Sequence, residues 1–203
     1  MDAAVRATAN IEGMGLLDRI KDTFFSADGE LARPRPATFD VLPNTVHAPV
    51  TGMVVSLEEV NDEVISGGLF GRGCGVMPVD GVVYAPVSGC VSVTAVTNHM
   101  IGMTMDVGVE LLIHVGLGTV DMDGRGFERL VEEGQEVVAG TPLLVFDREE
   151  IAESGYDDVV TCVVTNYSDF DGVEGVYESG TLIGGRPLVK VGDPLLVVRH
   201  AAR

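Results

Sequence analysis

The sequence predicts an all-β fold made of short antiparallel strands, and three observations support that class. Hydrophobic residues make up 46% of the 203 residues, which is enough for one sizeable core. This apolar content is divided into many short Val, Ile and Leu runs, a pattern typical of strands. The 26 glycines and 9 prolines interrupt the runs in the way that turn residues do. The length favours one domain with an added tail over two full domains.

The N-terminal tail is predicted to span residues 1–39, ahead of a globular domain over residues 40–203. Residues 14–25 form an apolar stripe at helical spacing, which predicts a short amphipathic helix. The apolar positions of this helix are Leu16, Leu17, Ile20, Phe24 and Phe25. Such a short helix is marginal alone in water, so it needs a membrane, a partner or its own domain as a surface. Residues 26–39 carry two prolines and little apolar content, as linkers do.

Repeated turn motifs indicate that the domain contains similar β-units that face each other. Residues 48–52 and 85–89 both read Ala-Pro-Val-Ser/Thr-Gly, and each precedes a β-rich run. A second pattern, Val-x-x-Gly-x-Pro-Leu-Leu, occurs at 137–144 and 189–196. There glycine supplies a permissive backbone and proline a rigid restart. The paired motifs predict a β-sandwich.

Two other segments complete the expected secondary structure. Residues 147–154 are the one plausible short helix of the domain. Residues 159–165 read as a buried strand, because they form an apolar run rich in valine.

Charge and cysteine usage exclude several classes of function. The net charge of -18 makes the chain a poor nucleic-acid binder and suits a basic protein partner, although it also serves solubility. Cys74, Cys90 and Cys162 are odd in number and lack a CxxC spacing, which argues for a reducing compartment and against a disulfide frame or zinc knuckle. No apolar run approaches the ~18 residues of a membrane span, and the N-terminus lacks a signal peptide. We therefore expect a cytoplasmic protein.

The chain has four histidines, of which two are expected to be unremarkable in function. His47 opens the first Ala-Pro-Val turn, where a surface position is expected. His200 lies in the last four residues of the sequence and is expected to be frayed. Neither has an evident partner in the sequence.

His114 and His99 are the candidates for chemistry. His114 ends an apolar strand, where a lone histidine is most often a satisfied core residue. His99 changes that interpretation: if the strand of residues 91–97 pairs with that of 107–115, the two imidazoles share one site. The hydroxyl of Thr97, two residues before His99, can then fix the orientation of the His99 ring.

Two histidines without acidic or thiol companions suit phosphoryl relay chemistry. One ring nitrogen is the nucleophile, and the N–H of the same ring must be held by an acceptor, for which the Gly116 carbonyl is within local reach. A second imidazole can donate to the phosphoryl oxygens and spread their charge. The N–P bond formed in this way is labile, which suits onward transfer.

The segment Gly108–Val120 resembles the active-site signature of the glucose-type IIA proteins of the phosphoenolpyruvate-dependent sugar phosphotransferase system. Thr97-Asn98-His99 resembles the second histidine motif of that family. The resemblance extends over most of residues 41–199. Its other motifs are the Ala48–Gly52 turn, Asp62, Gly71-Arg72-Gly73, Gly124-Arg125-Gly126-Phe127 and Phe146-Asp147.

The resemblance implies a barrel-like antiparallel β-sandwich of the duplicated hybrid motif type. It implies that His114 carries the phosphoryl group on Nε2, that His99 lies opposite and supports it, and that Thr97 binds His99. Gly116 and Asp62 are the implied supporting residues. The implied donor is phospho-HPr and the implied acceptor is a cysteine on the IIB domain of a sugar permease. A regulatory role toward other proteins is compatible with this activity.

The resemblance also implies a shared apolar docking face around the two histidines. Its expected members are Val64, Ile65, Leu69, Phe70, Leu112 and Val120. One such face favours a monomer. Gly118 stands where many family members have Asp, and Ile65-Ser66 replaces a commoner Phe-Ala or Phe-Ser, which bears on partner preference. The tail resembles that of members that rest on acidic lipid, but with only two basic residues it implies weak peripheral contact at most.

Three alternatives remain open at the level of sequence. A zinc-dependent hydrolase on a related β-scaffold needs three protein ligands, and the sequence has neither H-x-H nor HExxH. No cofactor is therefore expected in isolation, although His99 and His114 could hold zinc with a partner's carboxylate. A biotinyl or lipoyl carrier domain would have to use Lys190, which lacks an attachment tetrapeptide. A purely regulatory module that binds partners according to its phosphorylation state is the third.

Overall fold

The computed structural model describes residues 33–60, 70–177 and 182–200. The chain divides into two compact units, residues 1–35 and 36–203, and the fold described here is that of the second. The helix expected at residues 14–25 lies outside the described residues. In the part of the chain that is described, no helix is long and apolar enough to cross a bilayer.

Antiparallel strands dominate the described residues, which confirms the all-β prediction. The first half of the unit contains β1 (Thr45–His47), β2 (Gly52–Val55), β3 (Arg72–Pro78), β4 (Val82–Tyr84), β5 (Gly89–Thr94), β6 (Met100–Thr104) and β7 (Glu110–Val115). The second half contains β8 (Phe127–Arg129), β9 (Glu136–Val137), β10 (Pro142–Phe146), β11 (Val160–Val164), β12 (Gly172–Gly175), β13 (Leu182–Ile183), β14 (Arg186–Val189) and β15 (Pro194–Arg199). The helical segments are η1 (Leu57–Glu59), η2 (Thr119–Met122), α3 (Arg148–Glu153) and η3 (Tyr167–Asp169).

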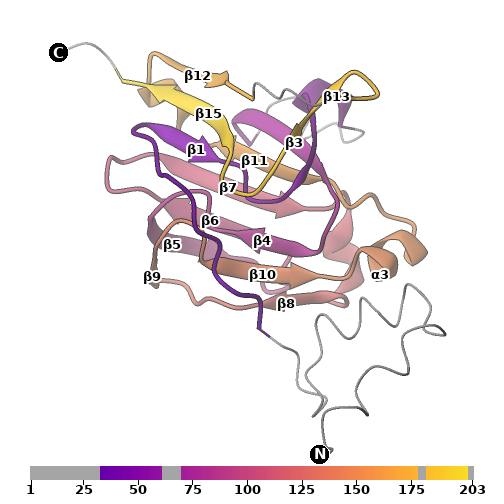
Figure 1. Ribbon diagram of the computed structural model, residues 1–203. Helices are drawn as coiled ribbons and strands as arrows, with labels where there is room; N and C mark the ends of the chain where they lie inside the picture. The colour runs from indigo at the N-terminus through magenta and orange to yellow at the C-terminus, as the bar shows by residue number, and fades with distance from the viewer. Residues whose placement is uncertain (1–32, 61–69, 178–181, 201–203) are drawn as a thin grey trace, which may run out of the picture. The chain divides into compact units, whose positions relative to one another are not determined.

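Three sheets account for these strands (Figure 1). The large sheet has the order β13-β14-β2-β3-β11-β7-β6-β5-β9. The two small sheets have the orders β1-β15-β12 and β4-β10-β8. The main hydrophobic core is shared by all three sheets, because it includes Val46, Val83, Ile113 and Leu144 together with their neighbours. The sheets therefore enclose one core, as a sandwich does.

The short helix and the buried strand lie where the sequence places them. Helix α3 begins after Asp147, whose carboxylate caps it by accepting from the backbone N–H groups of Glu149 and Glu150. Strand β11 is buried along its whole length between β3 and β7. A strand covered on both faces has no solvent side, which explains its continuous apolar run.

The two Ala-Pro-Val turns face each other and exchange backbone hydrogen bonds. The N–H of His47 donates to the carbonyl of Pro86 (3.1 Å), and the N–H of Tyr84 donates to the carbonyl of Pro49 (2.8 Å). Each motif thus supplies the same donor and the same acceptor position to the other. The repeat in the sequence is therefore a repeat in the hydrogen bonding of the fold.

The Gly-x-Pro-Leu turns complete this arrangement in the same reciprocal way. Each binds the alanine of one Ala-Pro-Val turn through two backbone hydrogen bonds. The bonds run from Ala48 N to Asp193 O (2.8 Å), Gly192 N to Ala48 O (3.1 Å), Ala85 N to Thr141 O (2.8 Å) and Gly140 N to Ala85 O (2.8 Å). Strands β2 and β5, which follow the two Ala-Pro-Val turns, accordingly occupy matching positions on either side of the β11–β7 centre of the large sheet.

The expected surface position of His47 is wrong, because the residue is buried between the facing turn and the segment before β1. Its side chain is 0% exposed. The ring nitrogen Nδ1 lies 3.1 Å from the carbonyl of Pro86, and Nε2 accepts from the N–H of Leu42 at 3.3 Å. The ring of Phe39 packs 5.1 Å away, centroid to centroid. Burial lowers the pKa of His47, so the neutral ring ties the segment before β1 to the core.

Candidate functional site

The two candidate histidines come together through strand β6, which lies between the two strands that were expected to pair. The expected pairing of the strand at residues 91–97 with that at 107–115 is wrong, because β6 lies between β5 and β7. His99 immediately precedes β6, and its neighbour Met100 stands directly opposite His114 across the β6–β7 pair. The backbone of His99 also joins β7, since its carbonyl accepts from the N–H of Val115 (2.8 Å).

The imidazoles of His99 and His114 form a compact pair. Their ring centroids are 4.8 Å apart, and the ring planes are nearly perpendicular at 82°. His99 is 6% exposed, whereas His114 is half-buried at the end of β7. The pair thus consists of one enclosed ring and one ring that reaches the surface.

Thr97 holds the enclosed ring. Its Oγ1 shares a hydrogen bond of 2.6 Å with Nδ1 of His99. This contact leaves Nε2 as the nitrogen of His99 that can serve another group. Burial lowers the pKa of His99, which favours its neutral form near pH 7. When the Thr97 hydroxyl donates to Nδ1, the neutral ring carries its proton on Nε2 and can donate it to an anion.

The turn after His114 contains Gly116, which packs closely against Thr119. Gly116 adopts a positive φ of 77°, and a Cβ at this position would meet Cγ2 of Thr119 at 2.2 Å. The hydroxyl of Thr119, which is fully buried, donates to the carbonyl of Val115 (2.7 Å). The N–H of Gly116 donates to the carbonyl of Val159 (2.8 Å). These two hydrogen bonds therefore fix the turn that follows His114.

A second apolar cluster lies on the face of the large sheet that carries His114. Because side chains alternate along a strand, Leu112 and His114 of β7 point to the same face. Leu112 is 9% exposed and belongs to this cluster, whose members are Val55, Leu57, Val60, Leu112, Val159 and Val163. Met100, opposite His114, and Leu117 pack against it. The half-buried histidine thus borders a buried apolar cluster.

The structure describes only some of the residues expected around the site. Phe70 and Val120 are exposed by 39% and 52%, respectively. Asp62, Val64, Ile65 and Leu69 lie outside the described residues, so their expected roles remain predictions. His200 is exposed and meets the ring of Phe170 edge-on, with ring centroids 5.1 Å apart. Within the described ranges, no three His, Cys, Asp or Glu side chains form a metal-binding cluster.

Two residues near the pair were not identified as site residues from the sequence. One is Thr119. It lies within the signature motif, but neither composition nor spacing marks it as a site residue. The other is Phe127, whose ring lies 6.4 Å from that of His99, centroid to centroid, at 74°. The Gly-x-Gly-Phe motif was the available signal for Phe127, although nothing in the sequence connects it with His99.

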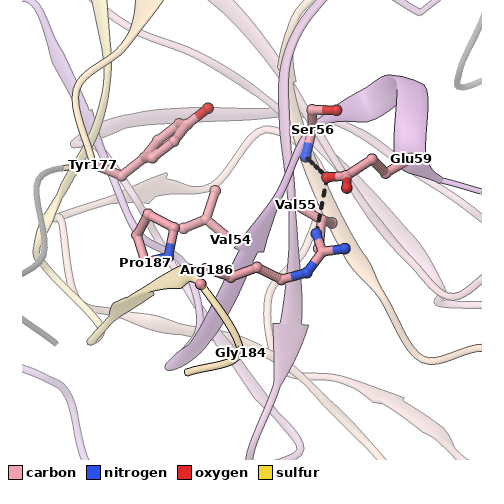
Figure 2. A pocket seen from close by; sticks show the side chains of 9 residues that line it. Val54, Val55, Ser56, Glu59, Tyr177, Gly184, Arg186 and Pro187 are labelled. Carbon is pink, nitrogen blue, oxygen red and sulfur yellow. Dashed lines mark hydrogen bonds and ion pairs between the residues drawn. The ribbon is translucent and has the colours of Figure 1, made fainter. Parts of the chain in front are cut away.

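A shallow groove at the β2–β14 edge contains neither histidine (Figure 2). Figure 2 shows the Glu59 carboxylate between the backbone N–H of Ser56 and the guanidinium of Arg186. The ion pair between Arg186 and Glu59 measures 2.8 Å. The charges of Glu59 and Arg186 therefore satisfy each other, and their ion pair links η1 to β14.

Comparison with known proteins gives a family for this chain. The family model described as "phosphoenolpyruvate-dependent sugar phosphotransferase system, EIIA 1" matches residues 44–170. The match includes both histidines and the turns on which they depend.

Two curated relatives are PTS system beta-glucoside-specific EIIBCA components. The protein of Bacillus subtilis (strain 168) is 40% identical over 136 residues, which cover 67% of this chain and 22% of the relative. That of Dickeya chrysanthemi is 40% identical over 151 residues, which cover 74% of this chain and 24% of the relative. The chain thus spans about a quarter of the length of these relatives.

A solved structure supports the same relationship at the level of the fold. The glucose permease IIA from Mycoplasma capricolum matches with a TM-score of 0.63 and 32% identity, covering 75% of this chain and 94% of that one. The family match, which spans more than half of the sequence, and this structural match agree with each other. The chain therefore belongs to the EIIA 1 family of the phosphoenolpyruvate-dependent sugar phosphotransferase system.

Proposed function

We propose that this chain is a phosphoryl carrier that accepts a phosphoryl group from phospho-HPr on Nε2 of His114 and passes it to a cysteine of a IIB domain. The observation that carries the proposal is the edge-on pair of His99 and His114, with Thr97 bound to the enclosed ring. Family membership makes a role as a phosphotransferase component the general function. The specific donor and acceptor are the proposal.

The chemistry consists of two displacements at phosphorus. In the first, the lone pair of His114 Nε2 forms the N–P bond while the bond between phosphorus and the donor's nucleophile breaks. In the second, the thiolate of the acceptor cysteine attacks phosphorus, and the N–P bond breaks with its electron pair returning to His114. Neutral His99 donates its remaining N–H to a phosphoryl oxygen in both steps, which spreads the charge of the transferred group.

The setting of His114 suits a carrier that two proteins must reach in turn. The ring is half-buried and borders the apolar cluster around Leu112, whose members are themselves buried. Phe70 and Val120 expose apolar side chains that a partner can cover. We propose that Val64, Ile65 and Leu69 complete the same docking face and that Asp62 and Gly116 support the site.

The relatives support a proposal for the acceptor partner. The choice of sugar belongs to the permease and is not proposed for this chain. They are named EIIBCA components, so in those proteins the matching part belongs to the same polypeptide as B and C components. We propose a IIB domain as acceptor on this basis. We further propose that the chain acts in the cytoplasm as a monomer, with a domain over residues 40–203 and a tail over residues 1–39. It needs no resident cofactor, and its phosphorylation state regulates its binding to other proteins.

The experiment is phosphorylation in vitro with phosphoenolpyruvate, enzyme I and HPr, followed by intact mass. Wild type should gain one acid-labile phosphoryl group, and His114→Gln should gain none. His99→Gln should be phosphorylated but should transfer poorly to a IIB domain. The exposed histidine supplies the matched control, since His200→Gln should behave as wild type.

Two results would count against the proposal. Phosphorylation of His114→Gln would place the acceptor elsewhere. A wild type that stays unmodified, with the same enzyme I and HPr active on another IIA protein, would mean that the relay is absent. Zinc binding by the histidine pair and phosphate-independent binding of partners would then be the functions to test.

A further inference from the structure

The Gly124–Phe127 turn, for which the proposed function names no role, lies against the enclosed histidine. Its last residue, Phe127, begins β8 and is 8% exposed. The Phe127 ring meets that of His99 edge-on, with centroids 6.4 Å apart and an angle of 74°. Aromatic rings attract each other in this geometry at centroid distances of about 4.5–7 Å. Phe127 is thus a second neighbour of the His99 ring, in addition to Thr97.

The same turn also approaches the residue that binds His99. A Cβ built on Gly124 would lie 3.5 Å from the carbonyl oxygen of Thr97 and 3.6 Å from its Cα. An added methyl group at Gly124 would thus make ordinary van der Waals contact with Thr97, so this position of the turn lies near Thr97. The turn therefore lies next to both members of the Thr97–His99 unit, and it contacts His99 through the ring of Phe127.

The other side of the turn is fixed to helix α3. The guanidinium of Arg125 lies 2.6 Å from the Glu150 carboxylate, and the N–H of Asp147 donates to the carbonyl of Gly126 (2.8 Å). Within the turn, the N–H of Phe127 donates to the carbonyl of Gly124 (3.1 Å). Because these contacts hold the turn to α3, the turn can act as a rigid support for Thr97 and His99.

We propose that Phe127 is a positioning residue that, together with Thr97, fixes the plane of the His99 imidazole toward His114. Thr97 fixes one atom of the ring, Nδ1, but a single hydrogen bond leaves the ring free to tilt about that contact. The edge contact with Phe127 restricts the tilt. The perpendicular arrangement of His99 and His114 at 82° depends on both constraints. This inference rests on the proposed function only for its effect on phosphoryl transfer.

The test compares Phe127→Leu with Phe146→Leu. Phe146 of β10 stands directly opposite Phe127 of β8 and is similarly buried, so the two variants remove equal aromatic volume from the same core. Each should lower the melting temperature by a similar amount. Only Phe127→Leu should raise the pKa of His99 toward its ordinary value, measured by NMR titration of the imidazole, because it removes part of the burial that lowers this pKa.

The kinetic part of the test uses the phosphorylated protein. Phe127→Leu should still be phosphorylated on His114, but its transfer to a IIB cysteine should slow by about tenfold, as misplacement of a supporting group does. Phe146→Leu should transfer at the wild-type rate. In a His99→Gln background, Phe127→Leu should cause no further loss, because the residue that it positions is gone.

The outcomes separate this inference from the proposed function. If wild type is never phosphorylated, the carrier function fails, and the NMR comparison of the two phenylalanine variants still decides the positioning role. The positioning role is overturned if both variants shift the His99 titration equally, or if Phe127→Leu slows transfer as much in the His99→Gln background as in wild type. Phe127 would then contribute to the core alone.

Discussion

Replacing His47 by leucine should change the pH dependence of stability as well as its size. The leucine is of similar bulk but cannot bind the carbonyl of Pro86 or accept from the N–H of Leu42. Pro86 keeps the backbone N–H of His47 as a donor, and Leu42 lies near solvent, so neither partner is fully orphaned. At pH 7.5 we expect His47→Leu to lower the free energy of unfolding by about 1–3 kcal/mol, the usual effect of losing buried hydrogen bonds.

The effect of pH follows from the depressed pKa of His47. The unfolded chain binds a proton near the ordinary value of 6.5, whereas burial keeps the native ring neutral to lower pH. Below pH 6.5 the unfolded state therefore binds more protons, and the wild type loses stability as pH falls toward the native pKa. One such group contributes a slope of up to about 1.4 kcal/mol per pH unit. His99 adds a second contribution of the same sign.

Denaturant unfolding of both proteins at pH 7.5, 6.5 and 5.5 measures the difference. The destabilisation caused by His47→Leu should be constant above pH 6.5 and should shrink below it, since the variant lacks the contribution of His47 but keeps that of His99. His200→Leu, at an exposed position, should follow the wild type at each pH. A gap between wild type and His47→Leu that stays the same from pH 7.5 to 5.5 would refute the reasoning.

Two further substitutions test the immediate supports of the histidine pair. Gly116→Ala should destabilise the domain by at least about 1–3 kcal/mol, because the residue has a φ of 77° and the added Cβ would lie 2.2 Å from Thr119; a melting temperature equal to that of wild type would contradict the described turn. Thr97→Val keeps the shape of the side chain but removes the 2.6 Å hydrogen bond to Nδ1 of His99. NMR of the ring nitrogens should therefore show a changed tautomer ratio for His99 and an unchanged ratio for His47. An unaltered ratio for His99 would show that Thr97 does not select its tautomer.

The sequence was sufficient for the class of the fold because its turns are so regular. The Ala-Pro-Val and Gly-x-Pro-Leu motifs each carry residues whose backbone preferences point to turns, and the runs between them have the length of strands. Helix α3 was predictable for a similar reason, since Asp147 supplies a cap that binds its first backbone N–H groups. These features depend on neighbours in sequence, so local chemistry reveals them.

Two of the features that were missed depend on contacts between distant residues. The burial of His47 depends in part on a turn that begins 38 positions later, and no local pattern reports it. The place of β6 between β5 and β7 follows the order of the chain, and it was missed because residues 100–104 were not identified as a strand. The proximity of Phe127 to His99 similarly requires the path of the chain through η2 and the following turn. Tertiary structure, and not propensity, decides these positions.

The pairing of β1 with β15 has a consequence for how the domain can fold. Thr45 of β1 pairs with Val197 of β15, so the first and last strands of the described fold are neighbours, and Figure 1 shows them side by side. A ribosome that has made β1 must synthesise about 150 further residues before its partner exists. During that interval the edge of β1 and the apolar side chain of Val46 have no native cover from β15. Loop closure over such a separation makes folding slow, so release of the C-terminal strand from the ribosome sets the earliest moment at which the sandwich can close.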